Sequence, residues 1–264
     1  MDELVYSLLI AITAAVVWQT IVFAANLKLR RIDVIDVGWG LSFIVIAVAV
    51  AMAQQSTGAV GWWVLLMVTV WGVRLSWHIG KRFARSNQQD PRYTNLVKNY
   101  SSANKNVQVY ARVFMVQALL AVMVSLPVIV LLTYTPQVQF VVALGVSAWC
   151  AGLLIEVIAD RQLAKFLQSA KKDQLMTSGL WRYSRHPNYF GEALLWWGIA
   201  IMTLATSYWW VGAIGALTIT LLLRFVSGVP PAEARAASKT GWKDYKAKTP
   251  PFVPWFVCSV RHHR

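Results

Sequence analysis

The chain has 264 residues, of which 57% are hydrophobic and only 14% are charged, and its formal net charge is +14. This composition is far more apolar than that of a soluble domain. A positive charge would suit nucleic acid if a basic soluble domain carried it, but the sequence offers no such domain. We therefore expect a membrane protein without a nucleic-acid partner.

Seven apolar stretches come close to the roughly 20 residues that a helix needs to cross a bilayer. They cover residues 4–26, 38–54, 60–79, 110–133, 139–159, 189–205 and 207–226. No soluble domain is left over, so the sequence predicts an all-α, polytopic membrane protein with a single seven-helix domain over residues 1–264. The first stretch is too long for the apolar part of a cleavable signal peptide, and acidic residues precede it.

The distribution of Lys and Arg predicts the orientation of these helices. The connections around residues 55–59, 134–138 and 206 contain no Lys or Arg, whereas the alternate connections and the tail are basic. Under the positive-inside rule, the basic connections and the C-terminus face the cytoplasm and the N-terminus faces outward. We expect a multi-pass protein of a bacterial inner membrane that contacts membrane lipids, and no obligatory protein partner is implied.

The cysteines predict neither a disulfide nor a metal site. Cys150 lies within an expected span and Cys258 lies in the cytoplasmic tail. No group of His and Cys residues has the spacing of a zinc site. We therefore expect no bound metal.

Ionisable residues within or at the entry of the expected spans lie toward their cytoplasmic ends. They are Asp33, Asp36, Arg74, Glu156, Glu192 and Arg224. An arginine near a helix end can reach the interface, but the short glutamate side chains need partners or a wet cavity. The sequence therefore predicts a polar pocket that opens to the cytoplasm beneath an apolar chamber.

The motif RYSRHPNYFGE stands at the mouth of the sixth apolar stretch. Pro187 suits the first turn of a helix, which places Asn188 and Glu192 at positions i and i+4 on one face. Arg185 and His186 come directly before this turn, where backbone amides favour an anion. The motif therefore predicts a ligand site at the start of a helix.

Basic residues on both sides of this motif could bind the phosphates of a nucleotide. Lys165, Arg182, Arg185 and Arg235 have suitable charge, and arginines give bidentate contacts to phosphate. Loops that obey the positive-inside rule are basic in any case, so a pure topology signal remains the alternative. The sequence contains neither a Rossmann fingerprint nor a P-loop, so a nucleotide would bind in a membrane pocket.

The stretch SGLWRYSRHPNYFGEALLWWG, at residues 178–198, resembles the C-terminal signature of the steroid 5-alpha-reductase and sterol reductase superfamily. It looks closest to a bacterial branch that is mostly described as a domain of unknown function. Further similar stretches are IDVGWGLSF (35–43), WGVRLSWHIGKR (71–82), DPRYTNL (90–96), IEVIADRQLAKF (155–166) and SGVPPAEARAASKTGWKDYKAKTPPFVP (227–254). The resemblance therefore extends over nearly the whole chain.

This resemblance implies an NADPH-dependent reductase that acts on a carbon–carbon double bond of a steroid-like or other unsaturated lipid. The cofactor would be held by residues of about 155–254. Asn188 and Glu192 match a pair that contacts the nicotinamide end, and Asp160 matches an acidic residue that helps to hold the nucleotide. The full set of expected cofactor-binding residues is Asp160, Lys165, Arg182, Tyr183, Arg185, His186, Asn188, Tyr189, Glu192 and Arg235.

The group that would polarise a substrate ketone departs from the family pattern. Steroid reductases have a Gln-Glu pair on the second helix and a tyrosine on the third, and this chain lacks that trio. Gln54 and Gln55 lie at the outer end of the second span, which is the wrong depth. The second span offers Asp36 and the third offers Arg74 and His78. Asp36 with His78 is therefore the expected catalytic pair.

Two other functions are consistent with the sequence. Membrane methyltransferases of the isoprenylcysteine or phospholipid type, which use S-adenosylmethionine, share an RHPxYxG pattern that resembles residues 185–191. Asn188 at the variable position and Glu192 directly after the glycine favour a reductase over a methyltransferase. A lipid-binding or scaffold protein without enzymatic activity would not need its charges gathered at one depth.

Overall fold

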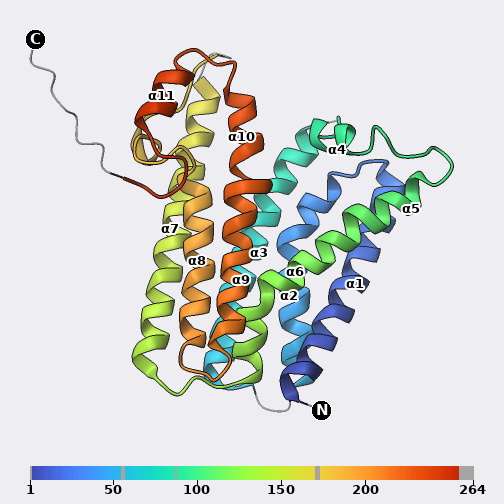
Figure 1. Ribbon diagram of the computed structural model, residues 1–264, viewed down its shortest axis with the longest axis vertical. Helices are drawn as coiled ribbons and strands as arrows, with labels where there is room; N and C mark the ends of the chain where they lie inside the picture. The colour runs from blue at the N-terminus through green and yellow to red at the C-terminus, as the bar shows by residue number, and fades with distance from the viewer. Residues whose placement is uncertain (1, 55–56, 87, 170–172, 256–264) are drawn as a thin grey trace, which may run out of the picture. The chain divides into compact units, whose positions relative to one another are not determined.

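The computed structural model describes residues 2–54, 57–86, 88–169 and 173–255 (Figure 1). Within these ranges the regular elements are helices and there is no strand, which confirms the predicted all-α fold. Gln55 and Cys258 lie outside the described residues. The chain divides into two compact units: Met1–Val142 with Thr203–Gly215, and Ala143–Met202 with Ala216–Arg264.

The first unit is built around four long helices. Helix α1 packs against α2 and α6, and α2 also packs against α3 and α6 (Figure 1). The elements of this unit are α1 (Glu3–Leu29), α2 (Val34–Ala53), α3 (Ala59–Arg85), α4 (Pro91–Leu96), α5 (Lys105–Val109), the π-helical turn η1 (Tyr110–Phe114) and α6 (Met115–Thr133).

Local sequence determines where α1 ends and where α4 begins. Arg30 takes the left-handed conformation, with φ of 55°, and its amide donates to the Asn26 carbonyl at 2.7 Å. The Asp90 side chain accepts from the amide of Arg92 at 2.9 Å, and Pro91 has no amide hydrogen to satisfy at the first helical position. These two helix ends determine where the α1–α2 connection begins and where the α3–α4 connection ends.

Buried polar side chains join α1 to α2 and α6. Ser7 of α1 is hydrogen-bonded to Thr133 at 2.8 Å and accepts from Gln54 at 2.7 Å. Further along α1, the Gln19 amide donates to Ser42 of α2 at 3.2 Å. Hydrogen bonds of this kind hold helices together where apolar surroundings offer no water. Gln54 lies at the C-terminal end of α2, at the opposite end from Asp36.

The second unit contains the segment from which a cofactor site was predicted. Helices α7 and α9 begin in the first unit and continue into the second. The elements are α7 (Gln139–Ser169), the 3₁₀ turn η2 (Gly179–Arg182), α8 (Pro187–Thr203), α9 (Trp209–Leu221), the π-helical turn η3 (Leu222–Val226), α10 (Val229–Ala236) and α11 (Trp242–Lys248).

Helices α7 and α8 run side by side with their backbones in direct contact (Figure 1). A Cβ atom at Gly152 would lie 2.5 Å from the Leu195 amide nitrogen and 2.6 Å from the Gly191 carbonyl oxygen. At Gly145 it would lie 2.5 Å from the carbonyl oxygen of Gly198. Only glycine allows two helices to approach so closely, and this contact holds α7 against α8.

Among the described residues, six helices are long and apolar enough to cross a membrane, which indicates a multi-pass membrane protein. They are Glu3–Leu29, Val34–Ala53, Ala59–Arg85, Lys105–Thr133, Gln139–Ser169 and Trp209–Ala236. The predicted stretch 189–205 forms helix α8, whose 17 residues lie at the lower limit of about 17–25 for a span. The predicted total of seven crossings therefore stays a prediction.

Replacing Gly152 with alanine is expected to destabilise the protein, because the new methyl group meets backbone atoms that cannot move independently. The free energy of unfolding in detergent should fall by about 1–3 kcal/mol. Gly80→Ala is the matched control, since its Cβ would meet only a Val37 methyl group at 3.6 Å. Equal unfolding curves for the two variants would contradict the close α7–α8 contact.

Candidate functional site

Arg185 is buried directly before α8 and ties together separate segments of the second unit. Its Nε and Nη2 donate to Oε1 of Glu233 at 2.8 and 2.6 Å. Its Nη1 donates to the carbonyl of Lys246 at 3.0 Å and to that of Thr249. These contacts occupy all three guanidinium nitrogens, and the side chain is only 7% exposed. Arg185 therefore joins these segments, and its predicted phosphate contact stays a prediction.

His186, the next residue, is buried and packs flat against Tyr189, with ring centroids 5.4 Å apart. Its Nε2 lies 3.7 Å from Oε1 of Glu233 and accepts no hydrogen bond from the described residues. Burial lowers the pKa of His186 to about 4, although the Glu233 charge acts in the opposite direction. The imidazole is therefore neutral at pH 7.

Asn188 of α8 and Asp160 of α7, two of the expected cofactor ligands, are in contact. The Asn188 amide nitrogen donates to Oδ1 of Asp160 at 3.2 Å. The Asn188 amide oxygen is buried and receives no hydrogen bond from the described part of the chain. Glu192, one turn further along α8, is also buried. The first turns of α8 therefore contain a buried amide oxygen that can accept a hydrogen bond from a ligand.

The loop before α8 is held against α7 and α11. Gln162 of α7 accepts from the amide of Leu180 at 3.0 Å, and the Trp181 indole donates to the Ala159 carbonyl at 3.2 Å. The Tyr245 hydroxyl of α11 donates to the Trp181 carbonyl at 2.5 Å. These contacts fix the position at which α8 starts, and with it the positions of Asn188 and Glu192.

The other predicted cofactor ligands of this unit lie at its surface. Lys165 near the end of α7, Arg182 in η2 and Arg235 in α10 are exposed. The Arg182 guanidinium lies 5.0 Å from the centre of the half-buried Tyr183 ring. Within the described residues these three cations form no ion pair, so their charges remain available to an anion.

Asp36 in the first unit has partners other than the predicted His78. Its Oδ1 accepts from the Tyr93 hydroxyl at 2.6 Å, and its Oδ2 accepts from Arg92 at 2.7 Å. His78 is exposed on α3. Arg92 also holds Asp90, at 3.1 Å, so α4 is bound across the first turn of α2. Asp36 is thus held in a network that includes Arg92 and Tyr93, and its catalytic pairing with His78 stays a prediction.

Tyr93 is the residue of this network that sequence reasoning missed. It lies in the motif DPRYTNL, but its separation of 57 residues from Asp36 gives no sign of contact. Burial and the Asp36 carboxylate raise the pKa of Tyr93 well above its ordinary value. Its proton therefore stays on the hydroxyl, directed at Asp36.

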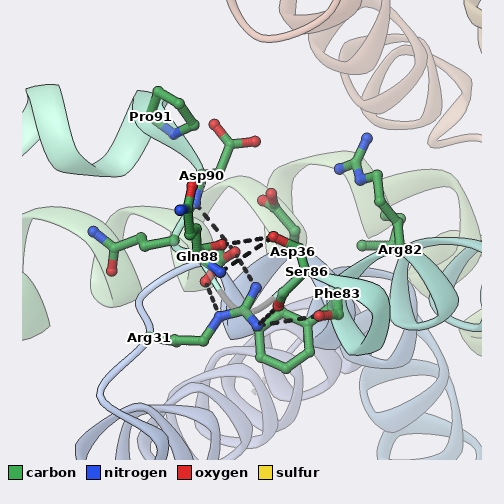
Figure 2. Close-up of a pocket in the computed structure, with 11 residues that line it drawn as sticks. Arg31, Asp36, Arg82, Phe83, Ser86, Gln88, Asp90 and Pro91 are labelled. Carbon is green, nitrogen blue, oxygen red and sulfur yellow. Dashed lines mark hydrogen bonds and ion pairs between the residues drawn. The ribbon is translucent and has the colours of Figure 1, made fainter.

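A cavity of about 230 Å³ lies beside this network (Figure 2). It is lined by charges of both signs, since arginines and aspartates face it from the α1–α2 connection, α2, α3 and the start of α4. The lining residues are Arg31, Asp33, Asp36, Ile79, Arg82, Phe83, Ser86, Gln88, Gln89, Asp90 and Pro91.

The six membrane-length helices of the described ranges, with charged side chains paired at helix ends, indicate a multi-pass helical membrane protein. More particularly, the chain belongs to the family described as protein of unknown function (DUF1295), whose model matches residues 22–249. No curated protein and no solved structure matches the chain.

The low pKa of His186 predicts a pH dependence of stability. Between its ordinary pKa of 6.5 and about 4, the unfolded chain binds a proton that the folded chain does not. The wild type should therefore lose stability as the pH falls through this range. His186→Gln should remove this part of the loss, whereas the exposed His78→Gln should follow the wild type. Denaturation midpoints at pH 7 and pH 5 provide the measurement, and parallel losses in all three proteins would contradict a buried neutral imidazole.

Proposed function

We propose that the protein is a membrane-embedded, NADPH-dependent reductase that transfers a hydride to a carbon–carbon double bond of a steroid-like or other unsaturated lipid. The observation that carries the proposal is the buried amide oxygen of Asn188, which lacks a donor among the described residues. Leaving such an acceptor unsatisfied costs about 1–3 kcal/mol, so a ligand donor at this position would be favoured.

The residues around Asn188 fit the nicotinamide end of the cofactor. A carboxamide presents N–H donors and a carbonyl acceptor, and Asn188 offers the complementary oxygen. Asp160 fixes the Asn188 amide through the 3.2 Å hydrogen bond, so the oxygen has a set direction. Neutral His186 avoids placing a positive charge beside a nicotinamide ring that becomes positive as it gives up hydride.

The phosphates would be held by Lys165, Arg182 and Arg235, which are exposed and carry uncommitted charge. When bound, NADPH supplies the hydride. The chain's part is to orient the nicotinamide through Asn188 and Asp160, because a small displacement of the donor carbon lowers the rate strongly. Asp36 with His78 is not part of the proposal, since Tyr93 and Arg92 occupy the Asp36 carboxylate.

The proposed substrate class follows from the membrane location. A multi-pass protein meets its most apolar substrates in the bilayer. The proposal includes a seventh crossing by α8, with the basic connections and C-terminus in the cytoplasm. This orientation would give the site access to cytoplasmic NADPH, and the proposed location is a bacterial inner membrane.

Asn188→Ala is expected to weaken NADPH binding about two- to tenfold, which corresponds to the loss of one hydrogen bond. Calorimetry on the detergent-purified protein measures this affinity, and the wild type should prefer NADPH over NADH because cations can hold the additional phosphate. Asn95→Ala, at an exposed position on α4, is the matched control and should bind as the wild type does.

Glu192→Gln should likewise reduce NADPH affinity while most of the thermal stability is retained. Normal affinity in both Asn188→Ala and Glu192→Gln would remove the cofactor role of this face of α8. Binding of S-adenosylmethionine without any nicotinamide nucleotide would move the assignment to the membrane methyltransferases.

The orientation is expected to place residues 82–107 and 228–264 in the cytoplasm. A Tyr100→Cys reporter, in a chain with Cys150 and Cys258 replaced by serine, should react with a membrane-impermeant maleimide only after cells are opened. A reporter at Asp2 should react in spheroplasts that are still intact. The opposite pattern would place the proposed cofactor site on the wrong side of the membrane.

A further inference from the structure

The cavity beside Asp36 lies at the level where two membrane-length helices end. It is bounded by the first turn of α2 and the last turns of α3, and both helices are long and apolar enough to cross a membrane. The exposed face of α3 is apolar through Val73 and Trp77, and Lys81 follows with its ammonium 4.6 Å from the Trp77 ring. Tryptophan followed by basic residues marks the interface, so the cavity lies at the depth of lipid headgroups.

Most charges in the cavity wall are already committed to one another. Arg31 binds both carboxylate oxygens of Asp33, at 3.1 and 2.8 Å. Arg92 bridges Asp36 and Asp90, whose side chains are still 20% and 24% exposed. These two carboxylates therefore keep acceptor positions that a ligand can reach from the cavity.

Arg82 is the exception among the lining cations. It is exposed, and within the described residues it makes neither a hydrogen bond nor an ion pair; no dashed line reaches it in Figure 2. The Arg82 charge nevertheless acts on Asp90. Burial raises the pKa of Asp90, but hydrogen bonds from Arg92 and the charges of Arg92 and Arg82 keep this pKa below its ordinary value. The wall thus offers one available cation and two partly exposed carboxylates.

This combination suits a small ligand that carries a phosphate and an ammonium group. An arginine is the preferred partner of a phosphate, and partly buried carboxylates favour an ammonium. The volume of about 230 Å³ is below the roughly 300–1,000 Å³ of pockets for drug-sized ligands, so a headgroup fits the scale and an acyl chain does not. The chains would lie along the apolar face of α3.

We propose that this cavity binds the phosphoethanolamine headgroup of a membrane phospholipid, with the phosphate on Arg82 and the ammonium toward Asp36 and Asp90. The site uses residues of the first unit only, so it does not rest on the proposed reductase function. A bound headgroup links α3 to α4, which the Asp36–Tyr93 bond already holds on α2. The lipid therefore stabilises the end of the helix group that faces this interface.

The test compares lipid binding by the wild type with Arg82→Gln and with Arg85→Gln, a control on the same helix that does not line the cavity. Native mass spectrometry in detergent measures the affinity for dioctanoyl phosphatidylethanolamine. We expect about tenfold weaker binding in Arg82→Gln, as for the loss of a charged hydrogen bond, and less than twofold change in Arg85→Gln. Arg82→Lys keeps the charge and should recover a large part of the affinity.

Further ligands separate the lipid from its alternatives. Dioctanoyl phosphatidylglycerol lacks the ammonium and should bind at least fivefold more weakly than phosphatidylethanolamine; equal binding would overturn the role of the carboxylates. Glycerophosphoethanolamine should bind weakly and inorganic phosphate more weakly still. Inorganic phosphate that competes at the same concentration as the lipid would show a free-anion site and overturn the proposal, as would equal effects of Arg82→Gln and Arg85→Gln.

Discussion

A charge next to an apolar interior must find a partner, and this requirement determines how the ends of the helices are joined in this protein. In the first unit, Asp36 at the start of α2 takes Tyr93 and Arg92 as partners, which brings α4 across the helix end. In the second unit, Arg185 takes Glu233 and two carbonyls of the C-terminal region. Each network binds a polar connecting segment to the end of a helix. The hydrophobic effect alone would not hold such a segment there.

The two networks have different consequences for chemistry. Around Arg185 every guanidinium nitrogen already donates a hydrogen bond, and the neighbouring His186 is kept neutral by burial. The Asn188 amide oxygen has unused hydrogen-bonding capacity, and the amide is already oriented by Asp160. A site built in this way binds through a fixed amide and not through a movable charge, which suits the uncharged, planar end of a cofactor.

Around Asp36 the balance differs, because the carboxylates outnumber the arginines that neutralise them at the cavity wall. Arg82 has no partner within the described chain, while Asp36 and Asp90 retain partial exposure. The separation of an available cation from partly exposed anions creates a dipolar cavity, which suits the zwitterionic headgroup proposed for it. Charge pairing thus gives a network around Arg185 whose charges are bound to one another. The network around Asp36 instead borders a cavity with charges that a ligand can reach.

The sequence by itself determined the helical, multi-pass architecture, because long apolar runs have one stable arrangement in a bilayer. It also placed Asn188 and Glu192 on one face of a helix, since Pro187 and the helical period act over only a few residues. The expected stretch 60–79 lies within a longer helix, because the polar last turns of α3 continue beyond the apolar part to Arg85.

Only the tertiary structure decided the partners of the charged residues. Asp36 and Tyr93 are 57 residues apart, and Arg185 and Glu233 are 48 apart, so no local pattern relates them. The expected depth of these residues in the membrane favoured His78 as the neighbour of Asp36 and a phosphate as the partner of Arg185. In the structure these residues have other partners, because a pairing depends on which connecting segments fold back over the helix ends. The packing of whole helices determines the course of those segments.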